Sequence, residues 1–328
     1  MASFLDTKRN DICFRIQLWL VAILALGACD QDQQPQATSC SAFEIVVGFG
    51  VGGGTDLFAR TLSKALQDDV GVPVQIVNIT AGSGVAAFRD VLRRPKDGCS
   101  LLALTTDYIV LASVQPQDVD LSQLRFLTRA HAELGLLSAK SDLDGGWNAI
   151  LARARNEDRP LLVGGVGARS FDRAVVNLAL KNAPASIRFR YIPYSGAKEM
   201  QADLLGGRLD LIYDEYGVMK PLLDAGKAKA VVFFYNEPLD VLPGVPTTTD
   251  LGLTTPPPIW RGLGMHKNVP DPIAIKLESA ILEALNSPAY KVYEQNRRLD
   301  LIDGRLDGAA FTAAIDEELI QFKAVLGQ

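Results

Sequence analysis

The sequence predicts an α/β protein of two domains, in which strands and helices alternate along the chain. Short apolar runs, of which Ile45–Phe49 is the first, have the length of buried strands. Patterns typical of helices separate these runs, and glycine-rich loops follow several of them directly. With 328 residues, the chain is long enough to form two domains.

The first domain is expected to begin with strand–helix units, which favour a parallel sheet. The predicted strands lie at residues 45–49, 74–77 and 101–104, and the predicted helices lie at 55–68 and before residue 93. A longer apolar segment, Phe126–Ser138, is expected to leave this domain as a crossing strand.

The second domain is expected to begin near Asn148 with a helix that runs to about residue 155. Its later elements are strands at 161–163, 188–192, 209–213 and 230–234, with helices ending near 182 and 205. Three prolines at 256–258 precede the predicted second crossing strand, 260–265. Three C-terminal helices are expected, at 272–285, 287–297 and 309–326.

The loop after the first strand is the strongest functional signal. Glycines dominate residues 48–54, and Thr55 and Asp56 stand where a helix N-cap belongs. Glycine lets a ligand approach the backbone, and a helix N-terminus favours negative charge. The loop has neither a phosphate-loop Gly-Lys-Ser/Thr nor a dinucleotide fingerprint, which leaves a carboxylate as the remaining common small anion. The alternative is a tight turn that binds nothing.

The N-terminal 28 residues read as a signal peptide, with basic Lys8, Arg9 and Arg15 ahead of a short apolar stretch. Leu26–Cys29 (LGAC) resembles a bacterial lipobox, so lipidation of Cys29 is expected; the alternative is ordinary cleavage near Ala28. Residues 29–41 are then a lipidated flexible tether.

Two further cysteines, Cys40 and Cys99, precede the first and third strands. In a parallel sheet of strand order 2-1-3 these strands are neighbours, and their starts lie together at one edge. Strands about 4.8 Å apart put flanking residues within bridging range. An oxidising compartment would then allow a disulfide. The alternative is two separate buried thiols.

Composition argues against several function classes. The formal net charge is −5 without a basic cluster, which disfavours nucleic-acid binding. The sequence has no HExxH, CxxC or GxSxG motif. A hydrolase using Ser83 or Ser170 would need a base, and neither of the two histidines lies near a loop motif. We therefore expect no catalytic residues, no metal and no cofactor.

Six segments resemble, in order and spacing, the receptors of tripartite tricarboxylate transporters, also called Bug receptors. The resemblance covers roughly residues 42 to 327, and its most specific part is PYSGAKEMQADLLGGRLDLIYD, within Tyr191–Tyr216. The other segments are Phe43–Arg60, Pro73–Leu92, Lys96–Thr106, Leu222–Phe233 and Leu242–Leu253.

The alternation of elements and the resemblance both imply a periplasmic type II binding protein, or Venus flytrap, with two parallel-core sheets joined by two crossing strands. Domain 1 is expected to comprise residues 42–134 plus 264–328, and domain 2 residues 135–263. The resemblance implies a monomeric receptor that captures a small carboxylate by domain closure and delivers it to membrane transporter subunits. Asp30 after the lipidated position implies retention at the inner membrane. A receptor that signals to a membrane kinase or regulator is the alternative.

Ligands of α/β sheets bind outside the carboxyl ends of the strands, so the site is expected in the loops there. The first-domain candidates are Phe49, Gly50, Gly52, Gly53, Gly54, Thr55, Gly82, Ser83, Thr105, Thr106 and Asp107. The second-domain candidates are Gly167, Ala168, Arg169, Ser170, Tyr194 and Asp214, with Ser195 and Gly196 beside them.

Two arginines depart from the family pattern and leave their roles open. Arg169 stands at a helix start, where it would either clamp a second carboxylate or lie in solvent. Arg261 lies on a crossing strand, which has a cleft side and an outer side. Asp107, Asp214 and Glu215 would either accept a ligand ammonium or bond to loop N–H groups. The ligand is thus either a plain carboxylate or an amino acid.

Overall fold

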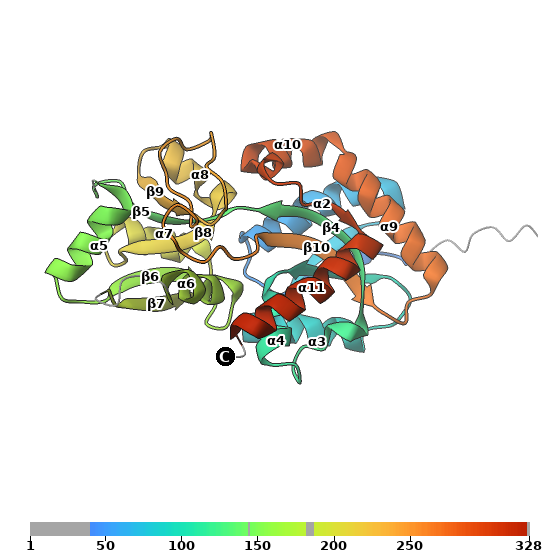
Figure 1. Cartoon of the computed structure of the whole chain (residues 1–328). Coiled ribbons are helices and arrows are strands. Elements are labelled where there is room, and N and C mark those ends of the chain that lie inside the picture. Colours follow the sequence, from blue (N-terminus) through green and yellow to red (C-terminus); the bar gives the residue numbers. More distant parts are fainter. Residues whose placement is uncertain (1–39, 144, 182–186, 327–328) are drawn as a thin grey trace, which may run out of the picture. The chain divides into compact units, whose positions relative to one another are not determined.

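The structure, a computed structural model, describes residues 40–143, 145–181 and 187–326. Its strands form two mixed sheets, each with its own helices, and we call each sheet with its helices a lobe (Figure 1). This is the two-domain α/β architecture that the sequence predicts. The expected signal peptide, the lipidation site Cys29 and most of the tether lie outside the described residues.

The first lobe has a six-stranded sheet in the order β11-β4-β10-β3-β1-β2. β1 pairs in parallel with β2 and β3, whereas β10 runs antiparallel to β3 and β4. The parallel core therefore follows the predicted 2-1-3 order, and antiparallel strands extend it on one side. The strands are β1 (Phe43–Val47), β2 (Val74–Asn78), β3 (Ser100–Thr105), β4 (Leu124–Glu133), β10 (Ile259–His266) and β11 (Leu306–Asp307).

Helices cover both faces of this sheet, because successive side chains of a strand point to opposite faces. In β1, Ile45 and Val47 join one core with α2 and α9, while Val46 joins another with α3 and α4. Figure 1 shows α11 running past α4 in this lobe, and the two helices are in contact. The helices are α2 (Gly54–Val70), α3 (Val85–Arg93), α4 (Asp107–Val114), α9 (Asp271–Asn286), α10 (Pro288–Arg297) and α11 (Gly308–Leu326).

The second lobe has a five-stranded sheet in the order β7-β6-β8-β5-β9. β6 lies parallel to β7 and β8, and β5 runs antiparallel to β8 and β9. The strands are β5 (Gly135–Lys140), β6 (Leu161–Val166), β7 (Phe189–Tyr194), β8 (Leu211–Glu215) and β9 (Ala228–Phe233). The helices are α5 (Gly146–Asn156), α6 (Phe171–Lys181), α7 (Ala197–Leu205) and α8 (Tyr216–Asp224).

The chain crosses between the lobes twice. The first crossing is Leu134, between the end of β4 and the start of β5. The return passes through the prolines at 256–258, after which β10 pairs with the first sheet from Ile259 to His266. The sheets therefore put residues 259–263 in the first lobe, whereas the sequence-based division puts them in the second. An apolar pattern locates such a strand but does not identify the sheet that it joins.

A disulfide joins Cys40 to Cys99, with their Cα atoms 5.6 Å apart. The two cysteines lie just before β1 and β3, and the Glu44 N–H donates to the Cys99 carbonyl at 2.9 Å. This is the pairing expected from parallel neighbouring strands.

Two helices were not expected from the sequence. α4 (DYIVLASV) is apolar almost all round and buried from Asp107 to Ala112, so it has no polar face to set a helical period. α8 contains Pro221, a residue that ordinarily argues against a helix interior. The predicted crossing strand 126–138 is in fact two strands, β4 and β5, in different sheets.

Candidate functional site

A cavity of about 360 Å³ lies where loops at the strand ends of both lobes meet. Ten of the predicted wall residues line it: Phe49, Gly50, Gly52, Gly53, Gly54, Thr55, Asp107, Ser195, Gly196 and Asp214. The other lining residues are Val51, Leu57, Thr80, Val166, Asp172, Ala197, Lys198, Glu199, Glu215, Val218, Ile259 and Arg261. The predicted glycine loop thus forms one wall of this cavity.

Nine predicted site residues do not line this cavity: Gly82, Ser83, Thr105, Thr106, Gly167, Ala168, Arg169, Ser170 and Tyr194. Several of them bond within the protein instead. The Thr106 hydroxyl accepts from the backbone N–H of Trp260 at 3.0 Å, and the Tyr194 hydroxyl donates to Asp203 at 2.7 Å. Arg169 is exposed. A position after a strand is therefore not sufficient to bring a side chain to the cavity.

The glycine loop leads directly into the N-terminus of α2. The cap is Gly53, which has no side chain to bond to the first N–H groups of the helix. Asp56, expected at the cap, lies in the first turn and accepts from the Gly52 N–H at 2.8 Å and from Arg60. Although burial opposes ionisation, these bonds lower the pKa of Asp56. Asp56 therefore fixes the glycine loop through the Gly52 N–H. The N-terminus of α2 has no side-chain cap.

A second helix N-terminus reaches the same cavity from the other lobe. α7 begins after Gly196, again without a side-chain cap. Lys198, in its first turn, lies beside the glycine loop: a Cβ on Gly52 would stand 3.6 Å from the Lys198 Nζ. Two helix N-termini and one ammonium group from opposite lobes therefore meet at this cavity, and all three favour a bound anion.

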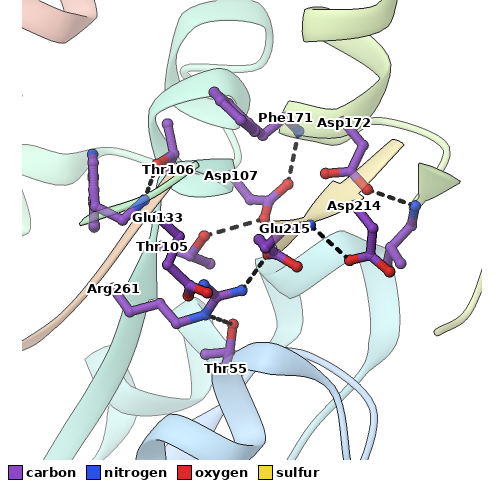
Figure 2. A network of polar contacts seen from close by, with 12 residues as sticks. Thr55, Thr105, Thr106, Asp107, Glu133, Phe171, Asp172, Asp214, Glu215 and Arg261 are labelled. Carbon is purple, nitrogen blue, oxygen red and sulfur yellow. Dashed lines mark hydrogen bonds and ion pairs between the residues drawn. The ribbon is translucent and has the colours of Figure 1, made fainter. Parts of the chain in front are cut away.

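Arg261 is buried at the cavity wall, with 3% of its surface exposed. Its guanidinium bonds to Glu133 in β4, to Glu215 Oε1 at 2.5 Å and more weakly to the Thr55 hydroxyl at 3.4 Å (Figure 2). A Cβ on residue 54 would overlap this guanidinium, so any side chain there would have to displace Arg261. Arg297 adds a second cation, 2.9 Å from Glu133. Burial opposes ionisation of Glu133 and Glu215, but Arg261 nevertheless lowers the pKa of both.

Three aspartates complete the cavity region. Asp107 accepts from the Phe171 N–H of the other lobe at 2.7 Å, and Asp172 accepts from the Val166 N–H at 2.7 Å. Asp214 accepts from the Glu215 N–H at 3.0 Å through Oδ1, while its buried Oδ2 has no partner in the described part of the chain. Burial raises the pKa of Asp107 to about 6 and raises the pKa values of Asp172 and Asp214 well above their usual range.

The residues expected at the site did not include Lys198, Asp172, Glu133 or Arg297. Lys198 lies within the predicted helix that ends near residue 205. The available signal for Glu133 was a carboxylate within the apolar run 126–138, since such a buried charge needs a partner. Nothing in the sequence indicated that Arg297, more than 160 residues later, would supply one.

Among residues 40–143, 145–181 and 187–326, no group of three or more histidine, cysteine or acidic side chains is arranged to hold a metal ion. Within the same residues, none of the helices combines the length and the apolar character that a membrane crossing requires.

Comparison with known proteins identifies relatives along nearly the whole chain. A protein of Agrobacterium vitis, described as the UPF0065 protein in the TAR-I ttuE-ttuC' intergenic region, is 26% identical over 313 residues, covering 94% of this chain and 86% of its own. The structure of MatC from Rhodopseudomonas palustris, with bound malate, has a TM-score of 0.74 at 23% identity, covering 87% of this chain and 98% of its own. R. palustris Rpa4515, with adipate, has a TM-score of 0.76 at 22% identity, covering 87% of this chain and 95% of its own.

The structural likenesses establish the fold, a two-domain periplasmic binding protein fold with mixed sheets. The family model "Tripartite tricarboxylate transporter family receptor" matches residues 58–326. That family consists of solute-binding receptors, not enzymes, in agreement with the sequence analysis. The chain therefore belongs to the receptor family of tripartite tricarboxylate transporters.

Proposed function

We propose that this protein binds a small carboxylate in the cavity between its lobes and delivers it to a tripartite tricarboxylate-type membrane transporter. The observation that carries the proposal is the meeting of two helix N-termini, those of α2 and α7, at one cavity. Neither helix has a side-chain cap, so its first N–H groups remain available to a ligand carboxylate. Malate and adipate in the two similar R. palustris structures are ligands of this chemical kind.

Ligand capture proceeds by closure of the lobes. Leu134 and the prolines at 256–258 are the two crossings about which the lobes would turn. Polar contacts already bridge them, among them the hydrogen bond from Phe171 N–H to Asp107 and the ion pair of Arg261 with Glu215. A carboxylate bound by both helix N-termini adds contacts that exist only when the lobes are together, so it selects the closed arrangement.

The N-terminal segment anchors the receptor beside its transporter. In this proposal Cys29 carries the lipid, residues 30–41 form the tether, and the receptor faces the periplasm from the inner membrane as a monomer. The support is the LGAC sequence at Leu26–Cys29 and the polar composition of the following ten residues, DQDQQPQATS.

Substitution of Gly53 tests the carboxylate site. Gly53 has φ −74° and ψ 170°, which valine can adopt, and a Cβ there would lie 3.2 Å from the Gly50 carbonyl. Gly53→Val therefore introduces bulk at the start of α2 with little backbone strain. It should remove binding in calorimetric titration with any carboxylate that a thermal-shift screen of the soluble chain returns.

Gly206→Val is the matched control. Gly206 also has φ near −75°, and its Cβ would also lie 3.2 Å from a carbonyl, that of Ala202, but it is exposed and does not line the cavity. Gly206→Val should bind the carboxylate with wild-type affinity. Unchanged affinity in a folded Gly53→Val protein would contradict the proposed site.

A further inference from the structure

The cavity has two regions of opposite character. Near Gly53 and Lys198 it presents N–H groups and an ammonium, which favour an anion. The remaining charged wall carries Asp107, Asp172 and Asp214, and Figure 2 shows Asp172 and Asp214 on the side of the polar cluster away from Thr55. A ligand with only a carboxylate group would interact favourably with the region near Gly53 and Lys198 alone.

The cations at this wall are already engaged with glutamates. Arg261 bonds to Glu133 and Glu215, and Arg297 bonds to Glu133. These contacts pair two guanidinium groups with two carboxylates. The hydrogen bonds to Asp107 and Asp172 come instead from the backbone N–H groups of Phe171 and Val166.

Asp214 gives the clearest indication of a hydrogen-bond donor on the ligand at this wall. Its residue is 4% exposed, it lines the cavity, and its Oδ2 is buried without a hydrogen-bond partner in the described residues. A buried carboxylate oxygen without a donor is costly, and native proteins ordinarily satisfy such groups. The charged groups that act on Asp214 are Glu215 from its own strand and Asp172 from α6, both of them acidic.

We propose that the ligand carries an ammonium group in addition to its carboxylate, and that Asp214, with Asp172 and Asp107, forms the ammonium subsite. This inference rests on the proposed function, because the glycine loop supplies the carboxylate end. An ammonium donates three hydrogen bonds and brings positive charge to Asp214, on which the acidic Glu215 and Asp172 act. The ligand class is therefore an amino acid or another aminocarboxylate.

Matched ligand pairs test the inference without any mutation. The pairs are glycine and acetate, aspartate and succinate, and 2-aminoadipate and adipate, each differing by one amino group. For at least one pair, calorimetric titration should show the amino member binding about 10-fold or more tightly than its partner, as expected for a charge-assisted hydrogen bond in a buried site. Proton release on binding of the amino member is expected as well, because its charge favours ionised aspartates whose pKa values burial has raised.

Asp214→Asn should reduce the ratio between the members of that pair to about one, while leaving the affinity for the carboxylate-only member within a few-fold. Asp224→Asn is the control, because Asp224 is exposed in α8 and pairs with Lys220 outside the cavity. If Asp214→Asn does not fold, Asp172→Asn serves in its place, and the wild-type ratio still decides the question.

The outcomes separate this inference from the proposed function. Carboxylate-only members that bind as tightly as, or more tightly than, their amino partners would overturn the ammonium subsite. If Gly53→Val removes their binding, the proposed function stands. Proton uptake with succinate or adipate would show instead that protonated aspartates donate to a second carboxylate. Absence of binding by every member of every pair would overturn both.

Discussion

The Arg261 guanidinium in β10 contacts the Glu215 carboxylate at the end of β8, with Nη2 2.5 Å from Oε1, and this ion pair joins the two lobes. The same guanidinium bonds to Glu133, at the end of the strand that leads to the first crossing. Arg261 thus holds together two buried acids that would otherwise repel each other. The sequence left open which side of the crossing strand Arg261 occupies, and the structure places it on the cavity side.

Arg261→Met should destabilise the protein strongly. Removal of the cation leaves Glu133 and Glu215 buried without their main partner, which typically costs about 3–5 kcal/mol. Urea denaturation followed by circular dichroism measures the loss. Arg89→Ala is the control: the Arg89 side chain is about half exposed, so loss of its ion pair with Asp118 should cost less than about 1 kcal/mol. Equal losses for the two variants would contradict the structural role assigned to Arg261.

The Cys40–Cys99 disulfide should be present in protein exported to an oxidising compartment and should stabilise it. The bond closes a loop of 59 residues, which corresponds to about 4 kcal/mol in the chain-entropy model. Intact mass should be two hydrogens below the reduced value, and the double variant Cys40→Ser/Cys99→Ser should melt at a lower temperature. Two free thiols in the exported protein would rule the bond out.

These first cases show which features can be predicted from sequence. The glycine loop, β1 and the cysteine pair were predictable because each depends on local pattern or on the order of neighbouring strands. α4 was missed because a fully buried helix has no polar face to mark its period. The Arg261 contacts were not predictable, since they depend on how β10, β4 and β8 come together in space. For the same reason the sequence did not indicate that Lys198 lines the cavity and Arg169 does not.

Stability should depend on the ionisation of Asp107. Burial raises its pKa to about 6 in the folded protein, against about 3.9 in an unfolded chain. The folded state therefore keeps a proton that the unfolded state has lost. The stabilising contribution is fully present below about pH 4 and is lost as pH rises through about 6, a change of about 3 kcal/mol.

Asp107→Asn isolates this contribution. Asparagine can still accept from the Phe171 N–H but does not ionise, so the wild type should lose about 3 kcal/mol relative to the variant between pH 4 and pH 8. The comparison at each pH is needed because burial lowers the pKa of His131, which acts in the opposite direction. Asp271→Asn, at an exposed side chain, should show no such dependence. A constant difference between wild type and Asp107→Asn would contradict the shifted ionisation.

Cys29→Ser should release the protein from membranes or block its processing, if the LGAC sequence is a lipobox. Fractionation of cells followed by immunoblotting measures both effects. Cys13→Ser, within the expected signal peptide, should behave like the wild type. Identical fractionation and migration of Cys29→Ser and wild type would indicate ordinary cleavage without a lipid.

Lys198 and Arg169 give opposite expectations for the same ligand. Lys198 lies against the glycine loop, so Lys198→Gln should weaken carboxylate binding by about 3- to 10-fold, a modest effect because the side chain is exposed. The loss should shrink at high salt, since screening reduces the contribution of an exposed charge.

Arg169 is also exposed but does not line the cavity, so Arg169→Ala should leave the affinities for mono- and dicarboxylates unchanged. Calorimetric titration of both variants with the same ligand, at low and at high salt, shows which of the two side chains contributes to carboxylate binding. A selective loss of dicarboxylate binding in Arg169→Ala would restore the clamp that the sequence suggested and would require the loop after β6 to move to the cavity on closure.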